Sequence, residues 1–178
     1  MTRILLADDS PHAQRMGERI LQEEGYEVVS VTDGETALVR LPDVDPDLVI
    51  ADAFLPRRSG FEICREVKNN ARFKHVRVVL TAGVLEPVDE VEASRAGSDA
   101  LIKKPFEASM VLDTIKPLLE ASKLARETEL LRAAGASATE EDPLHPERVR
   151  AAVTLALDAA MPALVDEITT RILNTLKK

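Results

Sequence analysis

Three aspartates stand where they could bind a metal ion and accept a phosphoryl group. Asp8 and Asp9 follow one short apolar run, and Asp52 follows another. Three carboxylates brought together repel one another, and without a cation at least one of them would have its pKa raised. Oxygen ligands with room for water and a phosphate suit Mg²⁺ better than Zn²⁺. These residues therefore predict a magnesium site.

Two further residues could complete a phosphoryl-transfer site. Thr81 and Lys104 also follow short apolar runs. An ammonium group and a hydroxyl group can bind phosphoryl oxygens while a carboxylate oxygen attacks phosphorus in line. We expect Thr81 and Lys104 to serve Asp52 in this way. Adjacent strand residues point to opposite faces, so Lys103 is expected to be a solvated strand residue.

The elements that must position these groups follow from the apolar pattern. Short runs rich in β-branched residues predict strands, and segments of helical period with capping residues predict the helices between them. The central strands are expected at Arg3–Ala7, Asp47–Ala51 and Val76–Leu80, and the edge strands at Glu27–Val31 and Ala100–Lys103. The helices are expected from Ser10 to Glu24, at Gly34–Leu41 ended by Pro42, at Ser59–Asn70, at Pro87–Ala96 and from Glu107 onward.

This alternation predicts an α/β fold, a doubly wound five-stranded parallel sheet with right-handed crossovers. Open sheets of this kind bind ligands beyond the carboxyl ends of their strands. All five candidate polar residues lie at such ends. The fold therefore predicts that they form one site.

At these residues the chain resembles the receiver domain of bacterial response regulators. The resemblance rests on the Asp8-Asp9 pair, on Asp52 followed by Leu55-Pro56 and Gly60, on Thr81-Ala82, and on Lys104-Pro105-Phe106. It covers roughly residues 1–122 and implies a flavodoxin-like sheet of order 2-1-3-4-5.

The resemblance also implies a role for each residue. Asp52 would accept a phosphoryl group from a sensor histidine kinase or a phosphotransfer protein. Asp9, Asp52 and the main-chain carbonyl of Phe54 would bind Mg²⁺ directly, and Asp8 would bind it through water. Thr81 and Lys104 would contact the phosphoryl group. Its binding would shift the surface around the fourth helix and fifth strand and so control a downstream protein target.

Two positions depart from the family pattern. Leu101 stands three residues before Lys104, where receivers usually have an aromatic residue, so an aromatic rotamer switch is not available. Phe54 is larger and more apolar than the polar residues often found two positions after the phosphoacceptor. We expect Phe54 to shield the acyl phosphate from water.

The remainder of the chain is expected to divide into two parts after a receiver domain at residues 1–122. Residues 123–146 are read as the end of the fifth helix and a linker, with linker composition at Ala133–Pro146. Pro117 is expected to kink the same helix earlier. Residues 147–178 carry an apolar stripe at helical spacing that cannot be buried alone. This tail could pack on the receiver, or assemble with copies of itself or another protein; we expect a homo-oligomer. Residues 157–165 are similar to short tails in some bacterial polar-organising and motility regulators.

Composition excludes several classes of function. No apolar stretch approaches the ~18 residues of a membrane span, and the first apolar run is too short for a signal peptide, so a cytoplasmic protein is expected. The net charge of -8 and the absence of Trp argue against nucleic acid. Cys64 is expected to be a buried apolar residue, and His12, His75 and His145 are expected on the surface or in caps.

Two alternatives to a phospho-accepting signalling protein stay open. A phosphatase of the haloacid dehalogenase type would also use a strand-end Asp, but it needs a second Asp two residues later as general acid. Phe54 occupies that position and cannot transfer a proton. A DNA-binding regulator would need a recognition helix, and Arg148, Arg150 and Arg171 do not form a basic one. We therefore expect no enzyme turnover and no nucleic-acid partner.

Overall fold

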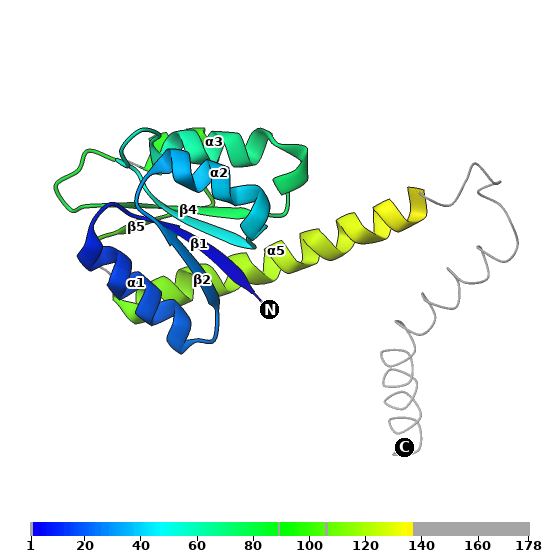
Figure 1. The fold of residues 1–178 in the computed structure, drawn as a ribbon, viewed down its shortest axis with the longest axis horizontal. Coiled ribbons are helices and arrows are strands. Elements are labelled where there is room, and N and C mark those ends of the chain that lie inside the picture. The colour runs from blue at the N-terminus through cyan, green and yellow to red at the C-terminus, as the bar shows by residue number, and fades with distance from the viewer. Residues whose placement is uncertain (1, 89, 106, 137–178) are drawn as a thin grey trace, which may run out of the picture. The chain divides into compact units, whose positions relative to one another are not determined.

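One five-stranded parallel sheet organises the protein (Figure 1). The computed structural model describes residues 2–88, 90–105 and 107–136. The strands are β1 Arg3–Ala7, β2 Glu27–Val31, β3 Leu48–Asp52, β4 Arg77–Ala82 and β5 Ala100–Lys103. The helices are α1 Pro11–Glu23, α2 Gly34–Val44, α3 Gly60–Asn69, a 3₁₀ turn η1 Ala71–Phe73, α4 Glu90–Ala96 and α5 Ala108–Ala136. The order β2-β1-β3-β4-β5 confirms the predicted fold, with β2 and β5 at the edges.

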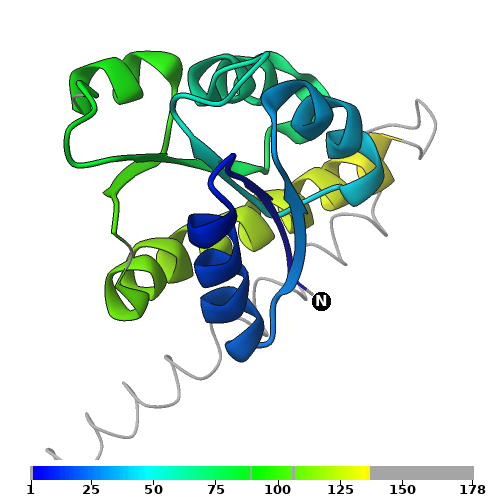
Figure 2. The same ribbon diagram turned by 60° about the vertical axis from the view of Figure 1, so that its left-hand side comes forward.

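Helices cover both faces of the sheet (Figures 1 and 2). Successive strand residues point to opposite faces, so Leu5 and Ala7 pack with α2, α3 and α4, while Ile4 and Leu6 pack with α1 and α5. Both layers bury their apolar side chains almost completely. The strands therefore read as continuous apolar runs, as expected for parallel strands that are buried on both faces.

Capping residues set most helix starts. Ser10 and Asp33 accept hydrogen bonds from the amides of Ala13 and Thr36, and Ser59 forms a reciprocal capping box with Glu62. Such caps satisfy amides that have no partner inside the helix. The first turns of α1, α2 and α3 are thus fixed locally by the sequence.

The expected end of the second helix is wrong. The helix passes through Pro42 and continues to Val44, where Asp45 adopts a left-handed conformation. A proline near the end of a helix removes only one internal hydrogen bond, and the three extra residues bury Val44. Packing therefore outweighs the local signal of the proline.

The fifth helix runs beyond the sheet, as expected. It has 29 residues, and Pro117, at which the sequence predicts a kink, lies inside it without ending it. Residues 1–132 form one compact unit. The sequence predicts a linker at residues 133–146, but α5 continues as helix to Ala136, so this expectation is wrong for residues 133–136. The rest of the predicted linker, residues 137–146, and the predicted tail at 147–178 lie outside the described residues, so those expectations stay predictions.

Arg126 connects α5 to the amino-terminal end of β3, the end of the sheet opposite the predicted site. Its guanidinium donates to Asp45 Oδ2 at 2.6 Å and to the main-chain carbonyl of Asp45 at 3.1 Å. Its Nε forms an ion pair with Asp47 at 3.3 Å, without the direction of a hydrogen bond. A second nitrogen lies 2.8 Å from His75 Nε2. The expectation that His75 is a surface or capping residue is therefore wrong, because this network buries it.

No helix among the described residues is both long enough and apolar enough to cross a bilayer. Cys64 is fully buried in α3. Burial raises the pKa of its thiol to about 11. The prediction that Cys64 serves as a small apolar core residue is confirmed.

Candidate functional site

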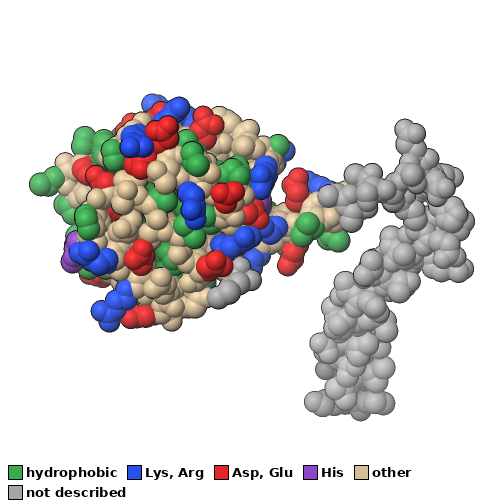
Figure 3. All heavy atoms as spheres, in the orientation of Figure 1, with side chains coloured by type: hydrophobic (Ala, Val, Ile, Leu, Met, Phe, Trp, Pro, Cys, Tyr) green, Lys and Arg blue, Asp and Glu red, His purple; other side chains and the backbone are tan. Residues whose placement is uncertain are grey.

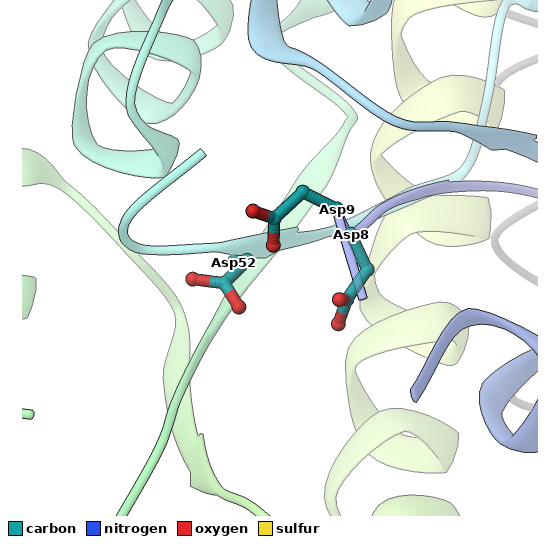
Figure 4. Close-up of side chains that lie close together, drawn as sticks. All are labelled: Asp8, Asp9 and Asp52. Carbon is teal, nitrogen blue, oxygen red and sulfur yellow. The ribbon is translucent and has the colours of Figure 1, made fainter. Parts of the chain in front are cut away.

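The three predicted metal-binding aspartates meet at the carboxyl end of the sheet (Figure 4). Asp8 and Asp9 follow β1, and Asp52 is the last residue of β3. Each offers a carboxylate oxygen, and these oxygens all lie within 4.8 Å of one another. Asp8 and Asp52 are buried, whereas Asp9 is exposed to solvent. The sequence pattern therefore located a real cluster of carboxylates.

Strand register brings the other two predicted residues beside it. Asp52 of β3 pairs with Thr81 of β4, and Ala82 pairs with Lys103, directly before Lys104. The sequence predicts both residues just after their strands, but Asp52 is the last residue of β3 and Thr81 is the second-last residue of β4. Thr81 is 1% exposed, and its carbonyl accepts a hydrogen bond from Ala53 N at 2.8 Å. Neighbouring strands thus hold the phosphoryl-binding candidates next to the phosphoacceptor candidate.

Asp8 is the most confined of the carboxylates. Its Oδ1 accepts a hydrogen bond from Ser10 N at 2.9 Å. Its Oδ2 lies 2.7 Å from Lys104 Nζ as an ion pair, although the direction is not that of a hydrogen bond. Burial raises the pKa of Asp8 above its ordinary value despite the partly opposing effect of Lys104. The site thus holds a buried anion that this single lysine does not fully stabilise.

Lys104 bridges two carboxylates. Its ammonium donates to Asp52 Oδ2 and pairs with Asp8. Burial alone would lower the pKa of Lys104, but its hydrogen bond to Asp52 and its ion pair with Asp8 raise it above the ordinary value. Lys104 is therefore a fixed positive charge at the candidate phosphoacceptor.

The loop after Asp52 returns to the carboxylate. Phe54 N donates to Asp52 Oδ1 at 2.8 Å, and the Phe54 side chain is 48% exposed. Gly60 N donates to the carbonyl of Ala53 at 3.2 Å, so α3 begins directly beneath the loop. This arrangement orients one Asp52 oxygen and leaves an exposed aromatic side chain on the loop that follows Asp52.

The donor set fits a hard divalent cation. Three carboxylates and one ammonium leave a negative excess in a site where Asp8 Oδ2 has no hydrogen-bond donor of good geometry. Magnesium prefers carboxylate oxygens and retains waters. Among the described residues no other group of three or more Asp, Glu, His or Cys side chains gathers in this way.

Two contacts near the site were missed in the sequence. Lys103, expected only as a solvated residue, donates to the Val88 carbonyl at 2.7 Å and so holds the segment before α4. A Cβ on Gly34 would lie 1.8 Å from the carbonyl oxygen of Arg58, so α2 begins against the loop that follows Asp52. Both contacts join segments distant in sequence, and no local pattern signals them.

Residues 4–116 match the family model described as response regulator receiver domain. The protein PilG of Pseudomonas aeruginosa is 31% identical over 114 residues, which cover 64% of this chain and 84% of PilG. The alkaline phosphatase synthesis transcriptional regulatory protein PhoP of Bacillus subtilis is 31% identical over 123 residues, covering 69% of this chain and 50% of PhoP. The match to the response regulator PleD of Caulobacter vibrioides covers only 26% of PleD.

Solved structures agree with these matches. The chemotaxis response regulator CheY4 of Vibrio cholerae superposes with a TM-score of 0.61 at 28% identity, over 66% of this chain and 98% of CheY4. NtrX of Brucella abortus gives a TM-score of 0.65 at 32% identity, over 74% of this chain and 30% of NtrX. The described α/β unit therefore shares its architecture with response regulators.

Proposed function

The chain belongs to the response regulator receiver family, and from this premise we propose that Asp52 is the phosphoacceptor of a two-component signalling protein. The family is one of signalling domains rather than of turnover catalysts. The single observation that carries the proposal is the position of Asp52, whose carboxylate lies against Lys104 and within 4.8 Å of Asp8 and Asp9.

The proposed reaction uses groups that the fold already holds together. An Asp52 carboxylate oxygen attacks the phosphorus of a phosphohistidine on a sensor kinase or a phosphotransfer protein. The new O–P bond forms as the P–N bond breaks, and the leaving imidazole keeps the electron pair and takes a proton from solvent. Lys104 then pairs with a phosphoryl oxygen, and the Thr81 hydroxyl donates to another. The scheme ends with the phosphoryl group on Asp52, and none of these groups is assigned a role in repeated hydrolysis of phosphate esters.

Magnesium is the proposed cofactor. Asp9, Asp52 and the Phe54 main-chain carbonyl would hold the ion directly, and Asp8 would hold it through water. Its chemistry would be to neutralise charge on the phosphoryl oxygens. The support lies in the oxygen-only donor set and in the raised pKa of Asp8, whose buried charge calls for more cation than Lys104 alone supplies.

The proposed output is a protein–protein contact. Phosphorylation would shift the surface around α4 and β5 towards one of two arrangements, as in population-shift switches generally. Leu101 is not aromatic, so the shift would pass through other contacts. The hydrogen bond from Lys103 of β5 to the Val88 carbonyl, next to the Lys104 that contacts Asp52, is one available connection. A cytoplasmic location and a protein target without nucleic acid remain part of this proposal.

Labelling with acetyl phosphate tests the phosphoacceptor directly. The wild-type chain should gain one phosphoryl group per molecule when Mg²⁺ is present, and none after chelation. Asp52→Ala should abolish the labelling, while Asp43→Ala, which changes an exposed aspartate of α2 outside the site, should keep it. Retained labelling in Asp52→Ala would refute the assignment.

The phosphatase alternative is separated by turnover. Incubation with p-nitrophenyl phosphate should release no more than one nitrophenol per protein molecule, because Phe54 stands where a general acid would be required. Repeated turnover by wild type that disappears in Asp52→Ala would favour the enzyme instead.

A further inference from the structure

The outer face of α5 carries a second apolar row that the receiver does not bury. The inner face packs Val111, Ile115 and Leu119 into the core. On the other side lie Met110, Pro117, Leu124 and Leu131, each seven residues from the next. Met110, Leu124 and Leu131 are 48%, 65% and 74% exposed. A seven-residue apolar repeat on a helix surface is typical of one helix packing along another.

The positions between these residues are shaped for close packing. Thr114, Ala121 and Thr128 fall four residues after Met110, Pro117 and Leu124, and complete a seam with the 3-4 spacing of a coiled coil. Each threonine hydroxyl donates to the carbonyl four residues earlier, at 2.8 Å in both cases. The hydroxyls are thereby satisfied within the helix. Each threonine can then contribute its methyl group to a packed seam without an unpaired polar atom.

Charges flank the seam asymmetrically. On one side Asp113, Glu120 and Glu127 repeat every seven residues and form an acidic row. The other side borders a groove of about 420 Å³ whose lining includes Ala125, Arg132, Lys74 and Arg77. Arg77 pairs with Asp99, whereas Glu120, Glu127, Arg132 and Lys74 form no ion pair within the described residues. Figure 3 shows hydrophobic, acidic and basic side chains together on the part of α5 that extends from the sheet.

We propose that this seam, residues Met110 to Leu131, is the contact through which α5 pairs in parallel with α5 of a second copy of the chain. In a parallel pair each acidic residue of the flanking row lies against the partner position five residues further along. Glu127 therefore meets Arg132 of the second copy. Glu120 meets Ala125, beside the groove that Lys74 and Arg77 line. Glu120 and Glu127 of each acidic row thus face the cationic groove or Arg132, whereas Asp113 meets the apolar Leu118.

The charge pattern also disfavours the antiparallel arrangement. Antiparallel helices would set each acidic row against the same row of the other copy, and like charges would repel. The seam spans roughly three heptads, near the lower limit for a stable coiled coil. The pairing is therefore expected to depend on protein concentration. It uses a surface different from residues 147–178, and it does not rest on the proposed phosphorylation.

Oxidative cross-linking in the full chain tests the pairing. Leu124→Cys places a thiol on the seam, and Leu130→Cys places one at an equally exposed position, 65% in each case, away from it. The native Cys64 is fully buried and does not interfere. In register, the two copies of residue 124 face each other, so Leu124→Cys should link at least about tenfold faster than Leu130→Cys. Equal rates, or no link through residue 124, would overturn the proposal.

A charge exchange tests the partner and its direction. Glu127→Arg and Arg132→Glu should each weaken dimerisation in sedimentation equilibrium, by roughly fivefold for surface ion pairs counted twice in the dimer. The double variant should restore the wild-type dissociation constant, because the pair is re-formed between copies. Glu129→Arg, a neighbouring exposed residue off the acidic row, is the control for net charge. Failure of the double variant to recover would overturn the parallel pairing, since assembly through another surface would show no rescue.

Discussion

Gly60 and Asp52 are packed so closely that a side chain at residue 60 would collide with the end of β3, which carries Asp52. A Cβ on Gly60 would lie 2.3 Å from the carbonyl oxygen of Asp52 and 3.0 Å from Leu80. The first residue of α3 therefore sets how near the helix comes to the end of β3. This contact positions the loop that carries Phe54.

Gly60→Ala is expected to disturb the site as well as the fold. Backbone must move to relieve the clash, at a cost of about 2 kcal/mol in the free energy of unfolding. Urea denaturation should show this loss, and acetyl phosphate labelling should slow markedly. Gly25→Ala is the control, since its cost arises from the positive φ of 81° and no atom lies within 4 Å. Unfolding at lower urea with normal labelling in both variants would contradict a role for Gly60 in the site.

Phe54→Asn is expected to shorten the lifetime of the phosphorylated protein several-fold. The exposed side chain lies two residues after Asp52 and is expected to shield the acyl phosphate, while the amide of residue 54, which donates to Asp52, is retained by the substitution. Loss of labelled phosphate over time gives the measurement. The control is Val39→Asn, which changes an exposed apolar residue of α2 and should leave the lifetime unchanged. Equal rates in wild type and Phe54→Asn would remove the shielding role.

Arg126→Ala should destabilise the receiver by about 2 kcal/mol, the range for leaving partly buried charged groups without their partner. Asp45 and the more deeply buried Asp47 would lose the guanidinium that joins them to α5. Urea denaturation of Arg126→Ala and of Glu129→Ala, an exposed residue outside the network and the acidic row, provides the comparison, and the latter should change stability by less than about 0.5 kcal/mol. Similar losses in the two variants would mean that the network contributes little.

His75 should make stability depend on pH below about 6.5. Burial and the neighbouring Arg126 hold the pKa of His75 below its ordinary value of 6.5, against the opposing effect of Asp45 and Asp47. The unfolded chain therefore binds this proton more readily, and stability falls as pH drops through and below 6.5. His75→Gln should flatten this part of the profile. The measurement is the free energy of unfolding of wild type and His75→Gln near pH 7.5 and near pH 5.5. An equal decline in the two proteins would contradict the prediction.

Removal of residues 136–178 should leave a folded receiver, because the compact unit ends at Arg132. If the predicted tail assembles, light scattering should show a lower mean mass for the shortened chain. Unchanged mass would count against that role of the tail. The cross-link at residue 124 should persist, since the α5 seam is retained.

The sequence by itself predicted the strands, most helix starts and the cluster of three carboxylates that the structure shows. These signals are local: apolar runs, capping residues such as Ser59, and polar residues that follow strand ends. Parallel strands placed Asp8, Asp52, Thr81 and Lys104 at one edge without further information. The predicted fold was confirmed for the same reason, because alternating strands and helices leave few ways to bury both faces of a sheet.

Only the tertiary structure decided features that join distant segments. Burial of Val44 carried α2 past Pro42, and a network spanning residues 45 to 126 buried His75. The hydrogen bond from Lys103 to the Val88 carbonyl depends on how the elements pack. The same holds for the close backbone contacts that leave no room for a Cβ at Gly34 and Gly60. Which side of α5 is exposed likewise depends on tertiary packing, because the opposite side is buried in the core. Local patterns specify elements, whereas packing selects among the contacts those elements could make.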